Sequence, residues 1–319
     1  MNEFSLIENF FADCTQKRED VALAVGDDCA LMTVPPGCEL AVSIDTLVAG
    51  VHFTAEVDSA ALGHKALTVG LSDLAAMGAE PAWATLALTL PELDRAWLAG
   101  FTQGLSKLAR SYGVQLVGGD TTRGPLAVTM QLHGFVPRGK ALRRDGARPG
   151  DGIYVTGTLG DSGLALQARL EGLQLSQEAL CYVEHRLDWP QPRVHEALAL
   201  RPLAHAAIDI SDGLAADLGH ILKGSGVGAA VEVEALPLSD SFRASLELEQ
   251  AWALALTAGD DYELCVTAPA EYHDRIQAVL SDRGCPCTLI GTIEEEPGFR
   301  CRRRNGASFI PQQQGYRHF

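Results

Sequence analysis

The chain has 319 residues and a formal net charge of −16, from 41 acidic and 25 basic residues. Its length suits two domains, and 47% hydrophobic against 21% charged residues is typical of a globular protein rather than a disordered one. The negative charge argues against nucleic acid and anionic membranes as partners, and no apolar run reaches the roughly 18 residues that a membrane-spanning helix needs.

The compartment that we expect is the cytoplasm. The N-terminal residues carry acids early and lack the basic start and long apolar stretch of a signal peptide. The eight cysteines form no Cys-x-x-Cys pair and no metal-ligand spacing, which predicts reduced, mostly buried thiols.

Strand and helix signals alternate through the first half of the sequence. Residues 40–44 form an apolar run of strand length, and Asp58 and Ser59 offer N-caps to a helix that ends at Met77-Gly78. In chain order we then expect a strand at 82–90, a helix at 92–112 followed by Gly113, and strands at 114–117 and 127–136.

A basic stretch rich in Gly and Pro, residues 137–150, predicts the boundary between one domain at 1–137 and a second at 138–319. In the second domain we expect a helix from about position 161, a helical region interrupted by prolines over 188–203, and a helix over 212–223 that is closed by Gly224. Strands are expected at 153–156, 208–210, 229–233, 252–257, 263–267 and 288–293. The alternation predicts the α/β class (α+β in part, with mixed sheets) in both domains.

Aspartates concentrate in short polar turns after strand-like runs, or at helix starts. The six sites are Gly26-Asp27-Asp28, Ser43-Ile44-Asp45-Thr46, Ser72-Asp73, Gly118-Gly119-Asp120, Asp209-Ile210-Ser211-Asp212-Gly213 and Gly259-Asp260-Asp261-Tyr262-Glu263. Each one alone is typical of a turn or an N-cap. If they converged, their mutual repulsion would require cations, and oxygen ligands without His or Cys favour Mg²⁺ bridging to phosphates.

The familiar nucleotide-binding and nucleophile motifs are absent from the sequence. It has no Gly-x-x-x-x-Gly-Lys-Ser/Thr, no Gly-x-Gly-x-x-Gly after a strand, and no Gly-x-Ser-x-Gly. A phosphate site here must use metal ions and backbone amides at turns such as Gly118-Gly119. His52 closely follows the Asp45 turn, and either a structural or a substrate-binding role is open to it at this point.

Eight motifs in chain order resemble the thiamine-monophosphate kinase family, and together they extend over essentially the whole chain. They are Phe4-Ser5-Leu6-Ile7, Gly26-Asp27-Asp28-Cys29-Ala30, Asp45-Thr46-Leu47-Val48 with His52-Phe53, Leu71-Ser72-Asp73-Leu74, Gly118-Gly119-Asp120-Thr121-Thr122, Tyr154-Val155-Thr156-Gly157, Asp209-Ile210-Ser211-Asp212-Gly213 and Asp260-Asp261-Tyr262-Glu263-Leu264. The resemblance implies a two-domain fold like that of aminoimidazole-ribonucleotide synthetase, whose N-terminal domains pair into a homodimer. It also implies ATP-dependent phosphorylation of thiamine monophosphate to thiamine diphosphate with several Mg²⁺ ions.

The resemblance also assigns roles by matched position. The magnesium ligands would be Asp28, Ser43, Asp45, Asp73, Asp120, Asp209 and Asp212; the ATP contacts Tyr112, Gly119, Asp120, Arg144 and Ser211; and the thiamine monophosphate contacts His52, Glu263 and Tyr316. We expect no catalytic base and no covalent nucleophile, only direct in-line transfer, because the accepting phosphate is already anionic near neutral pH.

One position departs from the family, which usually has Thr where this chain has Ile44, so the number of metal ions is open. Two alternatives are weighed against the kinase. One is another enzyme of the same superfamily: Cys14 lacks the glycine-rich context of selenophosphate synthetase, and the C-terminus lacks the cysteine of the hydrogenase-maturation relative, but the absence of motifs does not exclude a cyclo-ligase. The other is a metal- or nucleotide-binding module without catalysis, which a turnover assay separates from an enzyme.

Overall fold

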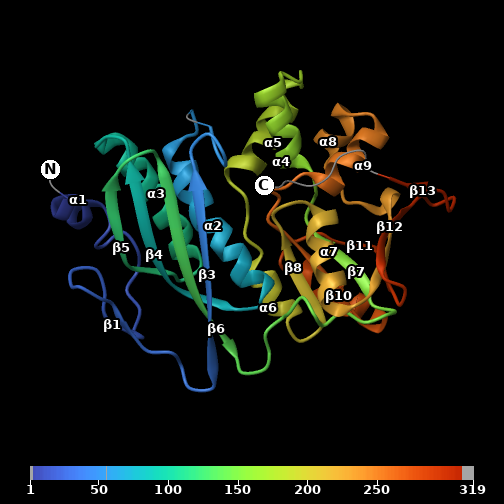
Figure 1. Ribbon diagram of the computed structural model, residues 1–319, viewed down its shortest axis with the longest axis horizontal. Helices are drawn as coiled ribbons and strands as arrows, with labels where there is room; N and C mark the ends of the chain where they lie inside the picture. The colour runs from blue at the N-terminus through green and yellow to red at the C-terminus, as the bar shows by residue number, and fades with distance from the viewer. Residues whose placement is uncertain (1–2, 55, 311–319) are drawn as a thin grey trace. The chain divides into compact units, whose positions relative to one another are not determined.

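The computed structural model describes residues 3–54 and 56–310, which separate into two compact units (Figure 1). Unit 1 contains the residues up to Leu74 and Ala79–Gly139, and unit 2 contains Ala75–Gly78 and the residues from Lys140 onward. Helices and mixed sheets occur in both units, so the predicted α/β class is confirmed. In the described part of the chain, no helix has the length and apolar character needed to span a membrane.

Unit 1 is built on a four-stranded sheet of order β3-β6-β4-β5, in which only β4 and β5 pair in parallel. Its elements are α1 (Glu3–Phe10), β1 (Val21–Leu23), β2 (Leu31–Met32), β3 (Cys38–Val48), α2 (Ser59–Ala76), β4 (Glu80–Leu90), α3 (Arg95–Ser111), β5 (Gln115–Arg123) and β6 (Ala127–Pro137). β1 and β2 form a separate antiparallel hairpin.

Glycines let α2 and α3 pack closely within unit 1. A Cβ atom on Gly70 of α2 would lie 2.6 Å from the Leu132 side chain of β6, so the helix sits directly on the sheet. A Cβ atom on Gly104 of α3 would lie 1.8 Å from the carbonyl oxygen of Ala60, so the two helix backbones touch. The layer of helices on a sheet buries residues such as Leu67, Leu71 and Phe101.

Unit 2 is built on a seven-stranded sheet of order β13-β12-β9-β11-β7-β10-β8, in which only β12 and β9 pair in parallel. Its elements are β7 (Gly152–Thr156), α4 (Asp161–Leu166), the π-helix η1 (Gln167–Glu171), α5 (Gln177–Asp188), α6 (Val194–Leu200), β8 (Ala206–Ile210), α7 (Leu214–Ser225), β9 (Gly228–Glu232), η2 (Val233–Ala235), α8 (Asp240–Ser245), α9 (Leu248–Thr257), β10 (Glu263–Ala268), η3 (Ala270–Tyr272), α10 (His273–Ser281), β11 (Cys287–Glu294), β12 (Gly298–Arg302) and β13 (Ser308–Phe309).

Three expectations for unit 2 were wrong. Residues 252–257 are not a strand but the end of helix α9, whose residues from Leu254 to Thr257 are all buried, so the helical period is hidden. Helix α7 continues through Gly224 and ends at Ser225, and Gly226 caps it in the left-handed conformation. The Pro-interrupted region 188–203 is helical only over α6 (Val194–Leu200), because α5 has already ended at Asp188.

Other local predictions are confirmed. The carboxylate of Asp58 accepts hydrogen bonds from the backbone N–H groups of Ala60 and Ala61 at 3.0 Å, as expected for the cap of α2. Gly113 follows α3 with a positive φ of 66°. All eight cysteines are free, but only Cys265, Cys285 and Cys301 are buried, so the expectation of mostly buried thiols was wrong.

Candidate functional site

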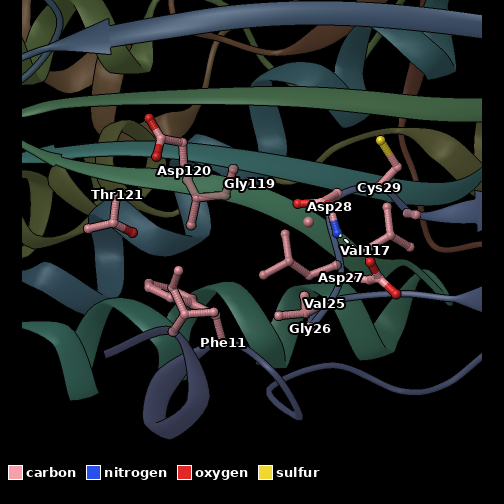
Figure 2. A pocket seen from close by; sticks show the side chains of 15 residues that line it. Phe11, Val25, Gly26, Asp27, Asp28, Cys29, Val117, Gly119, Asp120 and Thr121 are labelled. Carbon is pink, nitrogen blue, oxygen red and sulfur yellow. Dashed lines mark hydrogen bonds between the residues drawn. The ribbon is translucent and has the colours of Figure 1, made fainter. Parts of the chain in front are cut away.

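A cavity of about 430 Å³ in unit 1 brings two of the aspartate motifs together (Figure 2). One wall is the loop from Val25 to Ala30, between β1 and β2, and the other is β5 from Leu116 to Thr121. Figure 2 shows Asp28 and Asp120 on these walls and Phe11 of the segment after α1 at the base. The cavity therefore combines apolar surface with carboxylates, which suits a ligand with a flat apolar part and a charged part bound through cations.

Gly119 allows the wall formed by β5 to pack closely against β4. A Cβ atom at this position would lie 1.9 Å from the carbonyl oxygen of Leu86, closer than any side chain permits. The residue is exposed, as is Asp120 beside it. Gly118, Gly119 and Asp120 are thus not in the turn that the sequence predicts but within β5, where they line the cavity with backbone and one carboxylate.

Ser43, Asp45 and Asp73 form a second cluster in unit 1. The Ser43 hydroxyl donates to a carboxylate oxygen of Asp73 and lies 3.4 Å from Oδ2 of Asp45. Burial and the neighbouring Asp73 raise the pKa of Asp45 to about 6. A hydroxyl and two crowded carboxylates form a hard oxygen donor set whose repulsion a cation would relieve, so the cluster fits Mg²⁺.

The cavity and the cluster are separate sites. One row of paired residues runs across the sheet from Gly119 on β5, through β4 and β6, to Asp45 on β3. Three strand spacings place these backbones about 14 Å apart. Among the residues that the structure describes, no three acidic, His or Cys side chains form a ready metal site. The structure thus gathers the predicted ligands in small groups.

The imidazole ring of His52 is fixed by a backbone hydrogen bond at Nδ1. Its Nδ1 atom accepts a hydrogen bond from the backbone N–H of Val48 at 3.0 Å, which leaves the ring proton of the neutral form on Nε2. Backbone bonds from Val51 and His52 to the Val48 carbonyl close the same turn. The turn fixes the orientation of the imidazole that follows the Asp45 motif.

Unit 2 brings three sequence motifs side by side at the ends of β7, β10 and β8. Glu263 pairs with Ile210, and the backbone N–H of Asp260 donates to the Ser211 carbonyl at 2.9 Å. The Thr156 hydroxyl donates to Oε2 of Glu263 at 2.7 Å. Asp209 is buried on β8, whereas Ser211 and Asp212 are partly exposed in the turn after it.

Asp217 supports this turn. Its Oδ2 atom accepts the backbone N–H groups of Ser211, Asp212 and Gly213 at 3.0 to 3.1 Å. A single buried carboxylate therefore fixes three consecutive residues of the predicted metal and ATP motif. Two residues of the neighbouring motif, Asp260 and Tyr262, have positive φ values of 64° and 50°, a strained conformation that is often found at functional sites.

Glu263 is fully buried, with an exposed fraction of 0%. Both of its carboxylate oxygens accept hydrogen bonds from Arg193 at 2.6 Å, and Arg186 donates to Oε1 at 2.8 Å. The two guanidinium groups lower the pKa of Glu263 against the effect of its burial. Its observed partners are thus arginines, and its contact with thiamine monophosphate stays a prediction.

No contact with these groups is described for three further predicted residues. Tyr112 is the C-cap of α3, next to the start of β5. Arg144 is exposed, and its carbonyl accepts from the Ser225 hydroxyl at 3.0 Å. Tyr316 lies outside the described residues. Their roles stay predictions.

The sequence analysis missed the residues that support the motifs. Asp217 is the acidic residue in the first turn of α7, a recognisable signal for a helix N-terminus. Arg186 and Arg193 gave no signal, because arginine is usually a surface residue and their acidic partner is distant in sequence. Arg18 and Asp20, which hold the base of the β1–β2 hairpin, gave none either.

Both units match models of one family. The N-terminal domain of the AIR synthase related proteins matches residues 26–136, and their C-terminal domain matches residues 148–303. The thiamine-monophosphate kinase of Escherichia coli (strain K12) is 49% identical over 318 residues, covering 99% of this chain and 98% of that protein.

Two solved structures are similar over most of their length. The crystal structure of thiamine-monophosphate kinase from Stenotrophomonas maltophilia K279a has a TM-score of 0.88 and 44% identity, covering 94% of this chain and 96% of that one. A structure described as AaThiL complexed with AMPPCP and TMP has a TM-score of 0.79 and 31% identity, covering 90% of this chain and 89% of that one.

Proposed function

The chain belongs to the AIR synthase related proteins and, among them, to the thiamine-monophosphate kinases, and from this we propose that it transfers the γ-phosphoryl group of ATP to thiamine monophosphate. The products are ADP and thiamine diphosphate. The observation that carries the proposal is the similarity to AaThiL, a structure described with AMPPCP and TMP together, to which this chain is 31% identical.

The cavity in unit 1 is the proposed nucleotide site. Its apolar lining, which includes Ile7 and Phe11, suits a flat base, while Asp28 and Asp120 suit the cations that accompany a triphosphate. Gly118 and Gly119 line the same cavity without side chains, which would allow a phosphate to approach the main chain there. Arg144, Ser211 and Tyr112 are the further proposed ATP contacts.

Magnesium would be held by Asp28, Ser43, Asp45, Asp73, Asp120, Asp209 and Asp212. The cluster around Asp45 supports this, because its hydroxyl and carboxylate oxygens are the donors that Mg²⁺ prefers. Several ions are favoured over one, since ligands about 14 Å apart across the sheet cannot share an ion with bonds of about 2.1 Å. Bound magnesium neutralises phosphate charge during the transfer.

The proposed reaction is a direct in-line transfer without a general base or a phospho-enzyme. The attacking atom is a phosphate oxygen of thiamine monophosphate, which carries no proton to remove because the second pKa of a phosphate monoester is about 6. The protein's task is to orient two anions. His52, with Nδ1 engaged by Val48, is suited to donate through Nε2 to the substrate and not to accept a proton there.

We further propose a homodimer formed through unit 1. β3 is an edge strand of its sheet, and it exposes a row of apolar side chains: Leu40 at 44%, Val42 at 50% and Ile44 at 62%. Alternate residues of a strand share one face, so these three form a continuous apolar strip. Such a strip on an edge strand is typical of a surface that another chain covers.

The cytoplasm is the proposed compartment. All eight cysteines are free thiols, which suits a reducing environment. This compartment also supplies ATP for the proposed reaction.

The test is turnover by the purified protein with ATP, Mg²⁺ and thiamine monophosphate, followed by separation of the thiamine phosphates and of ADP. We expect equal amounts of ADP and thiamine diphosphate, and no product from free thiamine. Failure to form thiamine diphosphate would contradict the proposed reaction. Comparable turnover of free thiamine would show that the acceptor is a hydroxyl and not a phosphate.

A further inference from the structure

The loop that forms one wall of the cavity is the tip of a hairpin with a firmly held base. Arg18 precedes the hairpin, and its backbone N–H donates to Oε1 of Gln115 at 2.7 Å. Its Nη1 atom donates to the Gly113 carbonyl at 2.8 Å. Gln115 is buried and is the first residue of β5, the strand that forms the opposite wall.

Asp20 completes this attachment. It accepts from Arg18 at Oδ1 and Oδ2, with distances of 3.0 Å from Nε and 2.7 Å from Nη2. The indole Nε1 of Trp83 on β4 donates to Asp20 Oδ1 at 2.9 Å, and this ring is only 1% exposed. Removing Asp20 would therefore leave a buried indole N–H and a guanidinium without their shared acceptor. We call Arg18, Asp20, Trp83 and Gln115 the base anchor.

The hairpin transmits the position of the base anchor to the tip. The carbonyl of Asp20 accepts from the Thr33 N–H at 2.8 Å, so both strands start from the anchor. Val21 then pairs with Met32, and Leu23 with Leu31. The tip carries Asp28, whose N–H donates to the Asp27 carboxylate at 2.8 Å, a bond made within the tip itself. Ala24 and Ala30, at the two ends of the tip, also pack against the buried cluster that contains Trp83 and Val117. The separation of the tip from β5 therefore depends on the base together with these apolar contacts.

We propose that Arg18 and Asp20 are positioning residues for nucleotide binding, because they fix the hairpin to β4 and β5 and so set the distance from Asp28 to Asp120 across the cavity. Neither residue lines the cavity itself. The inference rests on the proposed function, since it takes the cavity to be the ATP site.

The test compares Asp20→Ala with Asp188→Ala. Asp188 forms a matched ion pair with Arg169 in unit 2: the side chains of Arg18 and Asp20 are 21% and 19% exposed, and those of Arg169 and Asp188 are 22% and 20% exposed. Turnover by the unmodified protein is measured first, so that failure of the proposed function is recognised separately.

For each variant we then measure the affinity for AMPPCP with Mg²⁺, the KM for ATP and for thiamine monophosphate, and the hydrogen exchange of residues 24–30. All measurements are made well below the melting temperature.

We expect Asp20→Ala to weaken AMPPCP binding and raise the KM for ATP by about tenfold, with little change in the KM for thiamine monophosphate. Amide hydrogen exchange at residues 24–30 should be faster in Asp20→Ala than in the unmodified protein. Asp188→Ala should lose stability without these changes. Asp20→Asn keeps an acceptor for Trp83 but loses the ion pair with Arg18, so it should weaken AMPPCP binding measurably but less than Asp20→Ala. If Asp20→Ala does not fold, Asp20→Asn is compared with Asp188→Asn instead. Unchanged AMPPCP affinity in the Asp20 variants, or an equal loss in Asp188→Ala, would overturn the proposal.

Discussion

The backbone N–H of Val48 donates to Nδ1 of His52 at 3.0 Å, so the ring proton of the neutral imidazole is on Nε2. A histidine held in this way orients a substrate through an N–H group. We therefore expect His52→Gln to raise the KM for thiamine monophosphate more than it lowers kcat, because glutamine keeps an N–H donor. Steady-state kinetics with each substrate varied measure this. A loss of kcat by orders of magnitude at unchanged KM would instead indicate proton transfer by His52.

The metal-free protein should become less stable as the pH rises from about 4 to about 6 through Asp45. Its pKa is about 6 in the folded state, against 3.8 for an ordinary aspartate, so the folded state holds a proton that the unfolded state releases. The contribution of Asp45 to the free energy of unfolding is fully present below the pKa of the unfolded state. It is lost as the pH rises through the pKa of the folded state. Urea unfolding in EDTA across this pH range, measured for the unmodified protein and for Asp45→Asn, isolates the effect. Equal slopes of the free energy of unfolding against pH for the two proteins would contradict it.

Magnesium should reverse that loss. A cation displaces the proton of Asp45, so the stabilisation by Mg²⁺ should grow between pH 5 and pH 7. Asp45→Asn should show little of this growth.

Ile44→Thr should leave the magnesium dependence almost unchanged. Ser43 and Asp45, which flank Ile44, reach Asp73, whereas successive residues of a strand face opposite sides, and Ile44 is 62% exposed. A threonine there would add its hydroxyl to the apolar strip of β3. We expect normal turnover at saturating magnesium and weaker self-association, measured by sedimentation. A large shift in the magnesium requirement would show that position 44 contributes a ligand.

Asp120→Asn and Asp212→Asn should nearly abolish turnover while the fold stays intact. Each removes a carboxylate from a proposed magnesium site without removing volume. The control is Asp94→Asn, because Asp94 only caps α3, through bonds to Ala96 and Trp97 at 2.8 and 3.2 Å. That variant should lose at most about 1 kcal/mol of stability and keep its activity. Near-normal turnover of either site variant at moderate magnesium would remove that residue from the site.

Gly157→Ala should destabilise the protein more than Gly284→Ala. Both glycines have similar positive φ values, 59° and 66°, so both substitutions incur about 1 to 2 kcal/mol of backbone strain. Only at Gly157 would the new Cβ lie 2.1 Å from Oε1 of Glu263, while nothing lies within 4 Å at Gly284. Thermal unfolding of the two variants measures the difference, and equal melting temperatures would show that Glu263 moves aside freely.

The sequence was sufficient for the family, the fold class and most strands, because alternating patterns such as that of residues 127–136 record a half-buried sheet. The sequence wrongly predicted a strand at the end of α9, where consecutive buried residues hide the helical period of hydrophobicity. It identified the aspartates but placed Asp45 and Asp120 in turns, whereas they lie within β3 and β5. It could not group them either, since the neighbours of a side chain depend on strand register. Ser43 and Asp73 are 30 residues apart, and nothing in the spacing pairs them.

The ion pairs around Glu263 also bear on the order in which unit 2 assembles. Arg186 and Arg193 precede their acceptor by 77 and 70 residues, and β10 lies between β7 and β8 in the sheet. During synthesis from the N-terminus, β7 and β8 emerge without the strand that joins them, and the two arginines emerge without their carboxylate. Unit 2 therefore cannot complete its interior until residue 263 has left the ribosome, so truncation before β10 should yield a chain that chaperones retain.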